Sequence, residues 1–483
     1  MRWRPALIAL IACLPHPRAS AQTPAPSPQT GDGITVEGSV RTRVEGWDWF
    51  GGTDNGTYAY SGTLARVMLS QVRTRLDWHL EFAVPVLVAL PEQPLGAGPA
   101  GLGANYFVAN DRSRQAASVF AKQAFVRFKE VGGVDGQSLT VGRVEFFDGA
   151  EVTPSNPTLA VLKRDRVASR LLANFGFTHV QRSFDGLKYV LDRSALNVTL
   201  LAARPTQGVF QVNGWGDLNI NVVYGALTRQ VDGTATAGEW RVFGVAYNDQ
   251  RQGLTKTDNR PPAERQHDPD PVTIGTIGGH YLRVIERGHG TFDLLAWGAA
   301  QVGSWGTLAH RAGAFAAEGG WQAHTPLEPW IRGGLDYASG DGNPTDTAHG
   351  TFFQLLPTPR LYARFPFFNL MNSVDAFGEV MLKPATRVTT RADVHSLRLA
   401  DGHDLWYQGG GAFQPTTFGY MGLPVGGHRG LGTLYDGSAD LTLTPQLSVG
   451  SYIAYASGGS ASAVSTPAHN HATLAFLELV VRF

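Results

Sequence analysis

Hydrophobic and polar residues alternate along most of the chain. Near the start, Val40 and Val44 occupy one side of an extended segment, and charged residues occupy the other side. The last residues repeat the pattern, with Leu477 and Leu479 on one side and Glu478 on the other. A period of two predicts β-strands that have one apolar and one polar face.

This alternation continues from residue 34 to the end of the chain without a helical interlude. Short turns alternate with long loops rich in Gly, Pro and Asp. The long loops are expected at 91–116, 147–178, 250–273, 339–371 and 400–428. A soluble sandwich shows the same alternation, but the length and the loop pattern favour a bacterial outer-membrane barrel. We therefore expect an all-β fold, a transmembrane antiparallel β-barrel of about 18 strands with short periplasmic turns and long extracellular loops. The expected strands include 64–77, 80–90, 138–146 and 179–191.

The N-terminus has the pattern of a secretory signal. Arg2 and Arg4 precede a short apolar run, and Ala19-Ser20-Ala21 has the small-residue form of a cleavage site. We expect residues 1–21 to be a signal peptide, 22–33 a Pro-rich segment and 34–483 the barrel. Cys13 would leave with the signal, although Leu10-Ile11-Ala12-Cys13 also has the form of a lipoprotein cleavage box.

Composition narrows the function classes. The chain has 40 Lys+Arg and 40 Asp+Glu residues, a net charge of zero, so no nucleic-acid partner is expected. Charged residues make up only 17% of 483, and 58 residues are Gly. Both values suit a barrel in which half of each strand faces lipid.

Several segments resemble the alginate-export family of outer-membrane porins. They are 141–149 (VGRVEFFDG), 181–187 (QRSFDGL), 335–344 (LDYASGDGNP) with 350–358 behind it, and 404–407 (DLWY). The terminal Phe483 is similar to the assembly signal of such barrels. The resemblance implies an 18-stranded monomeric barrel that exports an anionic polysaccharide through an Arg-rich lumen.

A guanidinium-lined lumen fits this chemistry, because fixed Arg side chains attract and orient carboxylates. We predict pore-lining or substrate-binding residues on the polar face of the strands. They are Arg41, Arg43, Arg73, Arg75, Arg127, Lys129, Arg143, Glu145, Arg182, Asp185, Arg332, Asp336, Arg387 and Arg391. For Arg143 the alternation is ambiguous, since it shares parity with Val141, and Arg182 is carried over only by its motif position.

The balance of charge departs from a dedicated polyanion conduit. Acidic residues such as Glu37, Asp77 and Glu379 share the expected lumen with the Arg residues. Cross-strand pairing of Arg with Asp or Glu would brace a polar lumen without binding a substrate. A mixed-charge aqueous channel with an Arg-lined constriction accommodates both observations.

Other candidate chemistry is weak. The loop from Asp336 to Asp346 contains Asp, Asn and Gly residues, but a turn explains it as well as a calcium site does. His469 and His471 would share a strand face, yet two His without a further ligand are poor evidence for zinc. Six aromatic residues near strand ends suit either membrane-interface girdles or ordinary packing: Trp47, Trp49, Tyr58, Tyr60, Tyr452 and Tyr455. No Gly-x-Ser-x-Gly elbow is present, so we expect no enzyme. Because the possible ligand sets are weak, we also expect neither a bound metal nor a cofactor.

The sequence thus predicts a passive outer-membrane channel for an alginate-like polysaccharide. A porin for small anionic or other hydrophilic solutes is the first alternative, and an adhesion barrel that binds partners through its long loops is the second. The expected partners are outer-membrane lipid and the anionic polysaccharide or small solute. Whether a periplasmic export machinery is also a partner is left open by the sequence.

Overall fold

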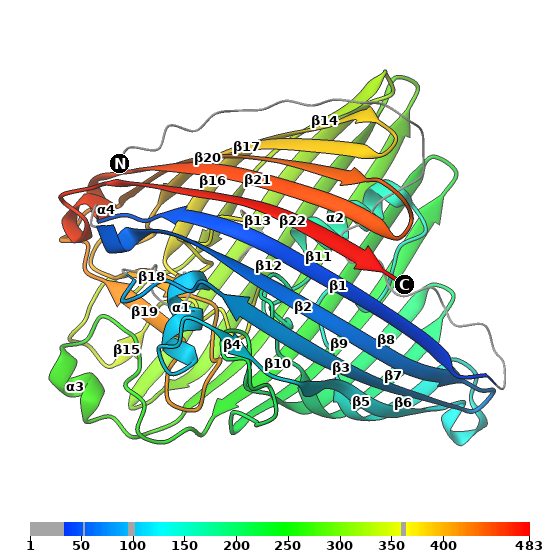
Figure 1. Cartoon of the computed structure of the whole chain (residues 1–483), viewed down its shortest axis with the longest axis horizontal. Helices are drawn as coiled ribbons and strands as arrows, with labels where there is room; N and C mark the ends of the chain where they lie inside the picture. The colour runs from blue at the N-terminus through cyan, green and yellow to red at the C-terminus, as the bar shows by residue number, and fades with distance from the viewer. Residues whose placement is uncertain (1–32, 52–53, 95–101, 359–363) are drawn as a thin grey trace.

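The alternating segments form one closed antiparallel barrel of 18 long strands, with the short β4 and β15 added to the same sheet. This computed structural model describes residues 33–51, 54–94, 102–358 and 364–483 (Figure 1). The predicted signal peptide and most of the Pro-rich segment lie outside these residues. Among the described residues, no helix has the length and apolarity to span a bilayer.

The long strands are β1 (Thr35–Asp48), β2 (Thr57–Val72), β3 (Leu76–Val88), β5 (Phe120–Lys129), β6 (Gln137–Val144), β7 (Phe184–Arg193), β8 (Leu196–Pro205), β9 (Ile220–Gly233), β10 (Thr236–Asp249), β11 (Val272–Arg287), β12 (Gly290–Trp305), β13 (Leu308–Ala323), β14 (Leu327–Ala338), β16 (Ser373–Ala385), β17 (Val388–Arg398), β20 (Gly430–Thr442), β21 (Leu447–Gly458) and β22 (His471–Arg482). The short strands are β4 (Ala116–Ala117), β15 (Ala348–His349), β18 (Trp406–Gly409) and β19 (Tyr420–Leu423). The helices are α1 (Leu102–Ala109), α2 (Pro157–Arg166), α3 (Pro262–Gln266) and α4 (Ser460–Ser465), with 3-10 turns η1 (Asp54–Gly56) and η3 (Val131–Gly133).

The barrel closes where its first and last strands meet. β1 pairs antiparallel with β22 from Ser39↔Arg482 to Asp48↔Thr473, and the two strands lie side by side in blue and red in Figure 1. Closure leaves no free sheet edge and satisfies the backbone within the wall, as a membrane requires.

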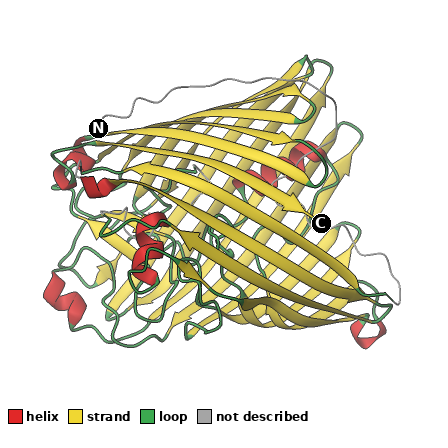
Figure 2. Cartoon of the chain, viewed as in Figure 1, coloured by secondary structure: helices red, strands yellow, loops and turns green. Residues whose placement is uncertain are grey.

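The two ends of the barrel differ as the loop pattern predicts. One end carries short turns, and the other carries long connections with α1, α3, α4, β18 and β19, whereas α2 lies inside the barrel away from that end (Figure 2). Two predicted boundaries are clearly wrong, since the strand expected at 179–191 begins only at Phe184 and the strand expected at 64–77 ends at Val72. The turn between β2 and β3 lies at 73–75, whereas 64–77 was expected to be a continuous strand. The apolar residues on both sides of this turn keep the same alternation, so periodicity alone did not reveal the break.

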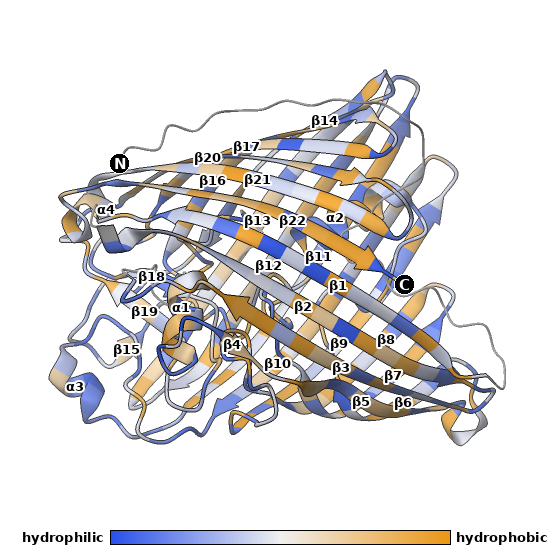
Figure 3. Ribbon diagram, viewed as in Figure 1, coloured by the Kyte–Doolittle hydropathy of each residue, from blue (hydrophilic) through white to orange (hydrophobic). Residues whose placement is uncertain are grey.

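The outer surface of the wall is apolar. Val44, Ile277, Val302 and Ile453 are all more than half exposed, on four different strands. Hydrophobic and hydrophilic positions follow each other along the ribbons in Figure 3. A belt of exposed apolar side chains around a closed barrel is the surface that meets lipid.

Most of the six candidate girdle aromatics pack inside the molecule. Trp47, Trp49, Tyr60 and Tyr452 are buried, and Tyr58 is half-buried. Tyr455 is the one of the six that is exposed. Trp49 contacts Phe365 with ring centroids 5.7 Å apart, so it packs against an inward-folded loop. Ordinary packing therefore describes most of this set better than an interface girdle does.

Candidate functional site: the lumen and its inward-folded loops

The connection between β6 and β7, residues 145–183, lies inside the barrel and is here called the plug segment. Its side chains and carbonyls contact β1, β10, β13 and β14. A segment that reaches strands spread around a closed wall does so from within. The residues that it contacts therefore identify the inner face of each strand.

The helix α2 of the plug segment has clear local causes. Asn156 caps its N-terminus by accepting a hydrogen bond from the backbone N–H of Leu159 at 3.0 Å, and Pro157 occupies the first helical position. Lys163, Arg164 and Arg166 lie in the last turn, where positive charge is favourable to the helix dipole. The same helix thus delivers two buried cations to the wall.

One side of the wall is locked to the plug segment by buried ion pairs. Glu318 on β13 accepts from Arg166 at 2.9 Å, from Arg170 at 3.2 Å and from Arg332 at 3.2 Å. Asp336 on β14 binds Arg170 at 2.7 Å. These side chains are at most 4% exposed, so water does not screen them.

The lock extends to the neighbouring strands. Lys163 binds Glu239 on β10 at 2.7 Å, and His280 on β11 contacts the same carboxylate at 2.8 Å. Arg332 also binds Asp293 on β12 at 3.0 Å. We call the inner faces of β10 to β14 and of β16 the sealed wall, because their charged groups are buried against the plug segment or against one another.

Within the plug segment, Asp148 holds the chain in place. Its carboxylate accepts hydrogen bonds from the backbone N–H groups of Leu171 and Leu172 at 3.0 and 2.8 Å. Burial raises the pKa of Asp148 to about 6, and Arg241 and these two N–H groups oppose that rise.

Two further loops fold inward and complete the filling of the outer half. The 339–372 loop joins the plug segment through the bridge Leu172↔Leu356, and it carries a run of buried aromatic residues. The 399–429 loop contacts the 339–372 loop through Asp404, whose carboxylate accepts a hydrogen bond from Thr351 at 2.6 Å. Within its own loop, Asp404 also accepts from Tyr407 at 2.7 Å. Burial raises the pKa of Asp404 to about 6, although four donors favour its charged form.

The opposite side of the wall is covered only in its outer part, where Arg43, Glu45, Glu81 and Lys122 are buried. We call the inner faces of β20, β21, β22, β1, β2, β3, β5, β6 and β7 the open wall. Inward side chains near its periplasmic turns keep contact with solvent: Arg127 is 44% exposed and Asp440 is 42% exposed. Exposure on an inward face means that water reaches the lumen at this point.

A row of polar residues crosses the open wall in register. Asp77 on β3 pairs with Arg127 on β5, Arg127 with Thr140 on β6, and Thr140 with Lys188 on β7. Asp77 also binds Lys129 at 2.8 Å. Arg127 and Lys129 bind this one carboxylate, and Lys188 lies further along the same row, so the row has three cations and one anion and a net positive charge. We call Asp77, Arg127, Lys129 and Lys188 the basic row.

Seven of the predicted lumen residues lie on the inner face of a strand: Arg41, Arg43, Arg127, Lys129, Arg332, Asp336 and Arg391. Each forms at least one ion pair. Arg43 illustrates the pattern, since it binds Glu45 at 2.6 Å and packs over the ring of Phe177 at 3.5 Å. Basic and acidic side chains therefore pair across neighbouring strands, or between a strand and the plug segment, at each of these seven positions. This is the bracing role that the balance of charge suggested.

Three predicted lumen residues lie in periplasmic turns. Arg73 and Arg75 lie in the turn between β2 and β3, and both are exposed. Arg387 lies between β16 and β17 and donates to the carbonyl of Leu443 at 2.8 Å. Their placement in the lumen was wrong because strand ends cannot be located from periodicity to within two residues.

Two more of the predicted lumen residues lie on the outer face of the wall. Arg143 and Asp185 are cross-strand partners with Nε to Oδ1 at 2.7 Å, and they share parity with the exposed Val141 and Leu187. Arg143 also donates to the carbonyls of Gly214 and Trp215, in the loop after β8. The alternation of β6 holds without a bulge that would turn Arg143 inward, so these two residues do not line the pore.

Glu145 and Arg182 lie at the two ends of the plug segment. Glu145 binds Lys122 at 3.2 Å and Arg66 at 3.4 Å. Arg182 is fully buried and donates to the carbonyl of Gly410 at 3.0 Å. Burial lowers the pKa of Arg182 to about 10. Both residues hold the plug segment between the wall and the 399–429 loop.

Sequence reasoning missed the residues that form the lock and part of the basic row: Lys163, Arg166, Arg170, Glu239, Glu318 and Lys188. The plug cations lie in a stretch interpreted as an extracellular loop. One available signal is the apolar content of that stretch, which includes Leu171 and Leu172, because a solvated loop does not need it.

The Asp336–Asp346 loop does not gather its carboxylates around one point. Asp336 is bound by Arg166 and Arg170, and Asp341 accepts from the backbone N–H of Asn343 at 3.1 Å. Among the described residues, this loop is not one of the groups of three potential metal ligands. The turn interpretation accounts for it.

The family model for alginate export matches residues 52–449. The chain belongs to the alginate-export family. Its barrel is thus an outer-membrane β-barrel of the channel type, and its location is the bacterial outer membrane. Among curated proteins no match was found.

Solved structures of outer-membrane channels share the fold. The outer membrane protein opdK from Pseudomonas aeruginosa is 10% identical, with a TM-score of 0.54 over 93% of this chain and 99% of that one. Acinetobacter baumannii OccAB2 is 10% identical, with a TM-score of 0.58 over 95% and 99%. Pseudomonas aeruginosa OccK2 (OpdF) in complex with glucuronate is 8% identical, with a TM-score of 0.54 over 93% and 96%. At these identities the likeness concerns the fold alone.

Proposed function

We propose that the protein is a passive outer-membrane channel for carboxylate-bearing sugars, from uronic acid monomers to short uronate oligomers. The basic row carries this proposal, since its three cations outnumber its one carboxylate and form a net positive patch on the water-accessible side of the lumen. Fixed cations attract carboxylates and orient them along the wall.

The sealed wall favours small solutes over a long polymer. The plug segment is held by buried charges at several points, and buried ion pairs are costly to break one partner at a time. A solute must therefore pass between a fixed plug segment and the open wall. A glucuronate complex is known for one neighbour of the same fold, which agrees with a uronate as solute.

Export of an alginate-like polymer is the second candidate, and it is favoured by family membership. A polyuronate repeats one carboxylate per sugar, so the same basic row would serve successive residues of a chain. A surface adhesion barrel lacks such support, because its long loops fold inward instead of projecting as a binding surface.

Planar-bilayer recordings test the proposal. We expect an anion-preferring conductance and current blockades by glucuronate that saturate with concentration. Blockades that lengthen with oligomer size, with polymer recovered on the far side, would favour polysaccharide export. A pure protein that inserts without conducting would refute both channel candidates and favour the adhesion alternative.

A further inference from the structure

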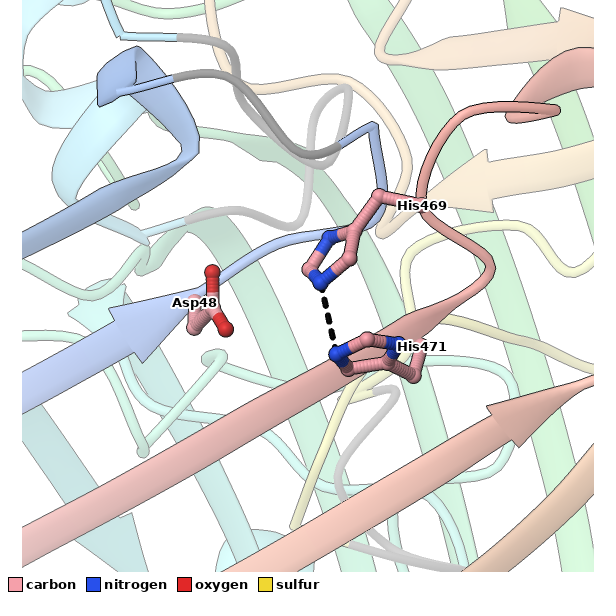
Figure 4. A group of neighbouring side chains, drawn as sticks. All are labelled: Asp48, His469 and His471. Carbon is pink, nitrogen blue, oxygen red and sulfur yellow. Dashed lines mark hydrogen bonds between the residues drawn. The ribbon is translucent and has the colours of Figure 1, made fainter.

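Three side chains with metal-binding atoms meet at the outer end of the barrel seam. Asp48 is the last residue of β1, His471 is the first residue of β22, and His469 lies two positions earlier (Figure 4). One potential ligand atom from each lies within 4.8 Å of the others.

The seam register brings these residues together. Asp48 pairs with Thr473, so His471 is its diagonal neighbour on the next strand. Asp48 shares parity with the exposed Val44, and His471 shares parity with the exposed Leu477. Both side chains therefore lie on the outer side of the wall, where the strands end, and not in the lumen.

The two imidazoles converge through the same type of atom. Nε2 of His469 lies 2.6 Å from Nε2 of His471, with the ring planes 65° apart. Thr57 donates a hydrogen bond of 2.8 Å to Oδ1 of Asp48 and so orients that carboxylate. Two His nitrogens and one oriented carboxylate are the ligand set of many three-residue zinc sites.

A second cluster has the same residue types but a different environment. Asp393, His395 and Asp436 also lie close together, yet Arg391 binds Asp393 at 2.6 Å. A guanidinium at that position competes with any cation. Among the described residues, Asp48 forms no ion pair with Lys or Arg, so its carboxylate is available to a metal.

We propose that Asp48, His469 and His471 bind a divalent transition metal, with zinc as the best match. Zinc takes His nitrogens at about 2.0–2.1 Å and Asp oxygens at about 2.0–2.2 Å, and water fills its fourth position. Two nitrogens on one tetrahedral ion lie about 3.3 Å apart, so the rings separate by about 0.7 Å on binding. The bound ion links the first strand of the barrel to the last.

Zinc titration of the folded protein in detergent tests the site. The protein is prepared without a polyhistidine tag, because a tag would bind the same metals. We expect one equivalent of Zn²⁺ by calorimetry, a loss of affinity of about tenfold or more in His471→Ala and in Asp48→Asn, and no comparable binding of Mg²⁺. His428→Ala, an exposed His in another loop, is the matched control and should bind as the parent does.

The link across the seam gives a second readout. Zinc should slow urea unfolding of the parent and of His428→Ala, and it should leave the unfolding rate of His471→Ala unchanged. If one His variant fails to fold, His469→Gln reports the same loss with less disturbance. Zinc binding that is equal in the parent and in these variants, or no binding at all, would overturn the proposal.

Discussion

The two sides of the lumen use the same kinds of residue in opposite ways. On the sealed wall, Glu318 binds three guanidinium groups that are at most 1% exposed. On the open wall, Arg127 faces a carboxylate and is still 44% exposed. Exposure, and not the count of Arg residues, therefore separates structural charges from charges that a solute can reach.

The contrast follows from where the plug segment lies. Desolvated charges interact strongly and require a partner, whereas hydrated charges interact weakly and can exchange partners. The neutral overall composition is then no objection to an anion channel, because the lock buries four carboxylates with four cations, and a solute meets only the charges that stay exposed. Four predictions test this comparison.

The largest effect is expected on the sealed wall. Glu318→Gln leaves Arg166, Arg170 and Arg332 with fewer negative partners in a buried site. We expect a loss of about 3–5 kcal/mol in the free energy of unfolding, measured by urea denaturation in detergent. Glu478→Gln is the matched control on the open wall, because the Glu478 side chain is 24% exposed. This substitution should lower the free energy of unfolding by about 1 kcal/mol or less. Equal losses would remove the distinction between the walls.

The inward loops should respond to pH. The raised pKa of Asp404, about 6, means that the folded state holds this proton more tightly than the unfolded chain does. This contribution to stability is complete below about pH 4 and is lost as the pH rises through 6, by up to about 3 kcal/mol. Urea unfolding at pH 4.5 and 7.5 should show the fall, and Asp404→Asn should reduce the difference. An unchanged difference would contradict the assignment.

Charge reversal on the open wall should change ion selectivity. In Arg127→Glu combined with Lys188→Glu, two of the three cations of the basic row become anions, while the lock stays intact. We expect the reversal potential in a salt gradient to move from anion preference toward cation preference, by severalfold in the permeability ratio. A selectivity that stays the same would place the passage elsewhere.

The smallest effect is expected in the periplasmic turn. Arg75→Glu reverses a charge at a residue that the sequence placed in the lumen but that is exposed in the turn after β2. Salt screens an exposed charge within about 10 Å, so the permeability ratio should change only slightly. A shift as large as that of the basic row would restore the original assignment.

The wall was predictable and the lumen was not. Lipid on one face imposes a strict alternation, which is why residues such as Val44 and Leu477 revealed the strands and why half of the fourteen predicted lumen residues lie on inner faces. The alternation also placed Arg143 outside, once the absence of a bulge was known. The plug segment has no such periodic constraint. Its position depends on contacts such as Arg166 with Glu318, which are 152 positions apart and carry no local signal.

The pairing of β1 with β22 also bears on how the molecule is assembled. Arg43 and Glu478, bonded across the seam, are 435 positions apart in the sequence. The wall therefore cannot close before the whole chain has been made, and every shorter form presents two unpaired sheet edges. Such forms aggregate readily, so the chain needs to be kept from self-association until its last strand is in place.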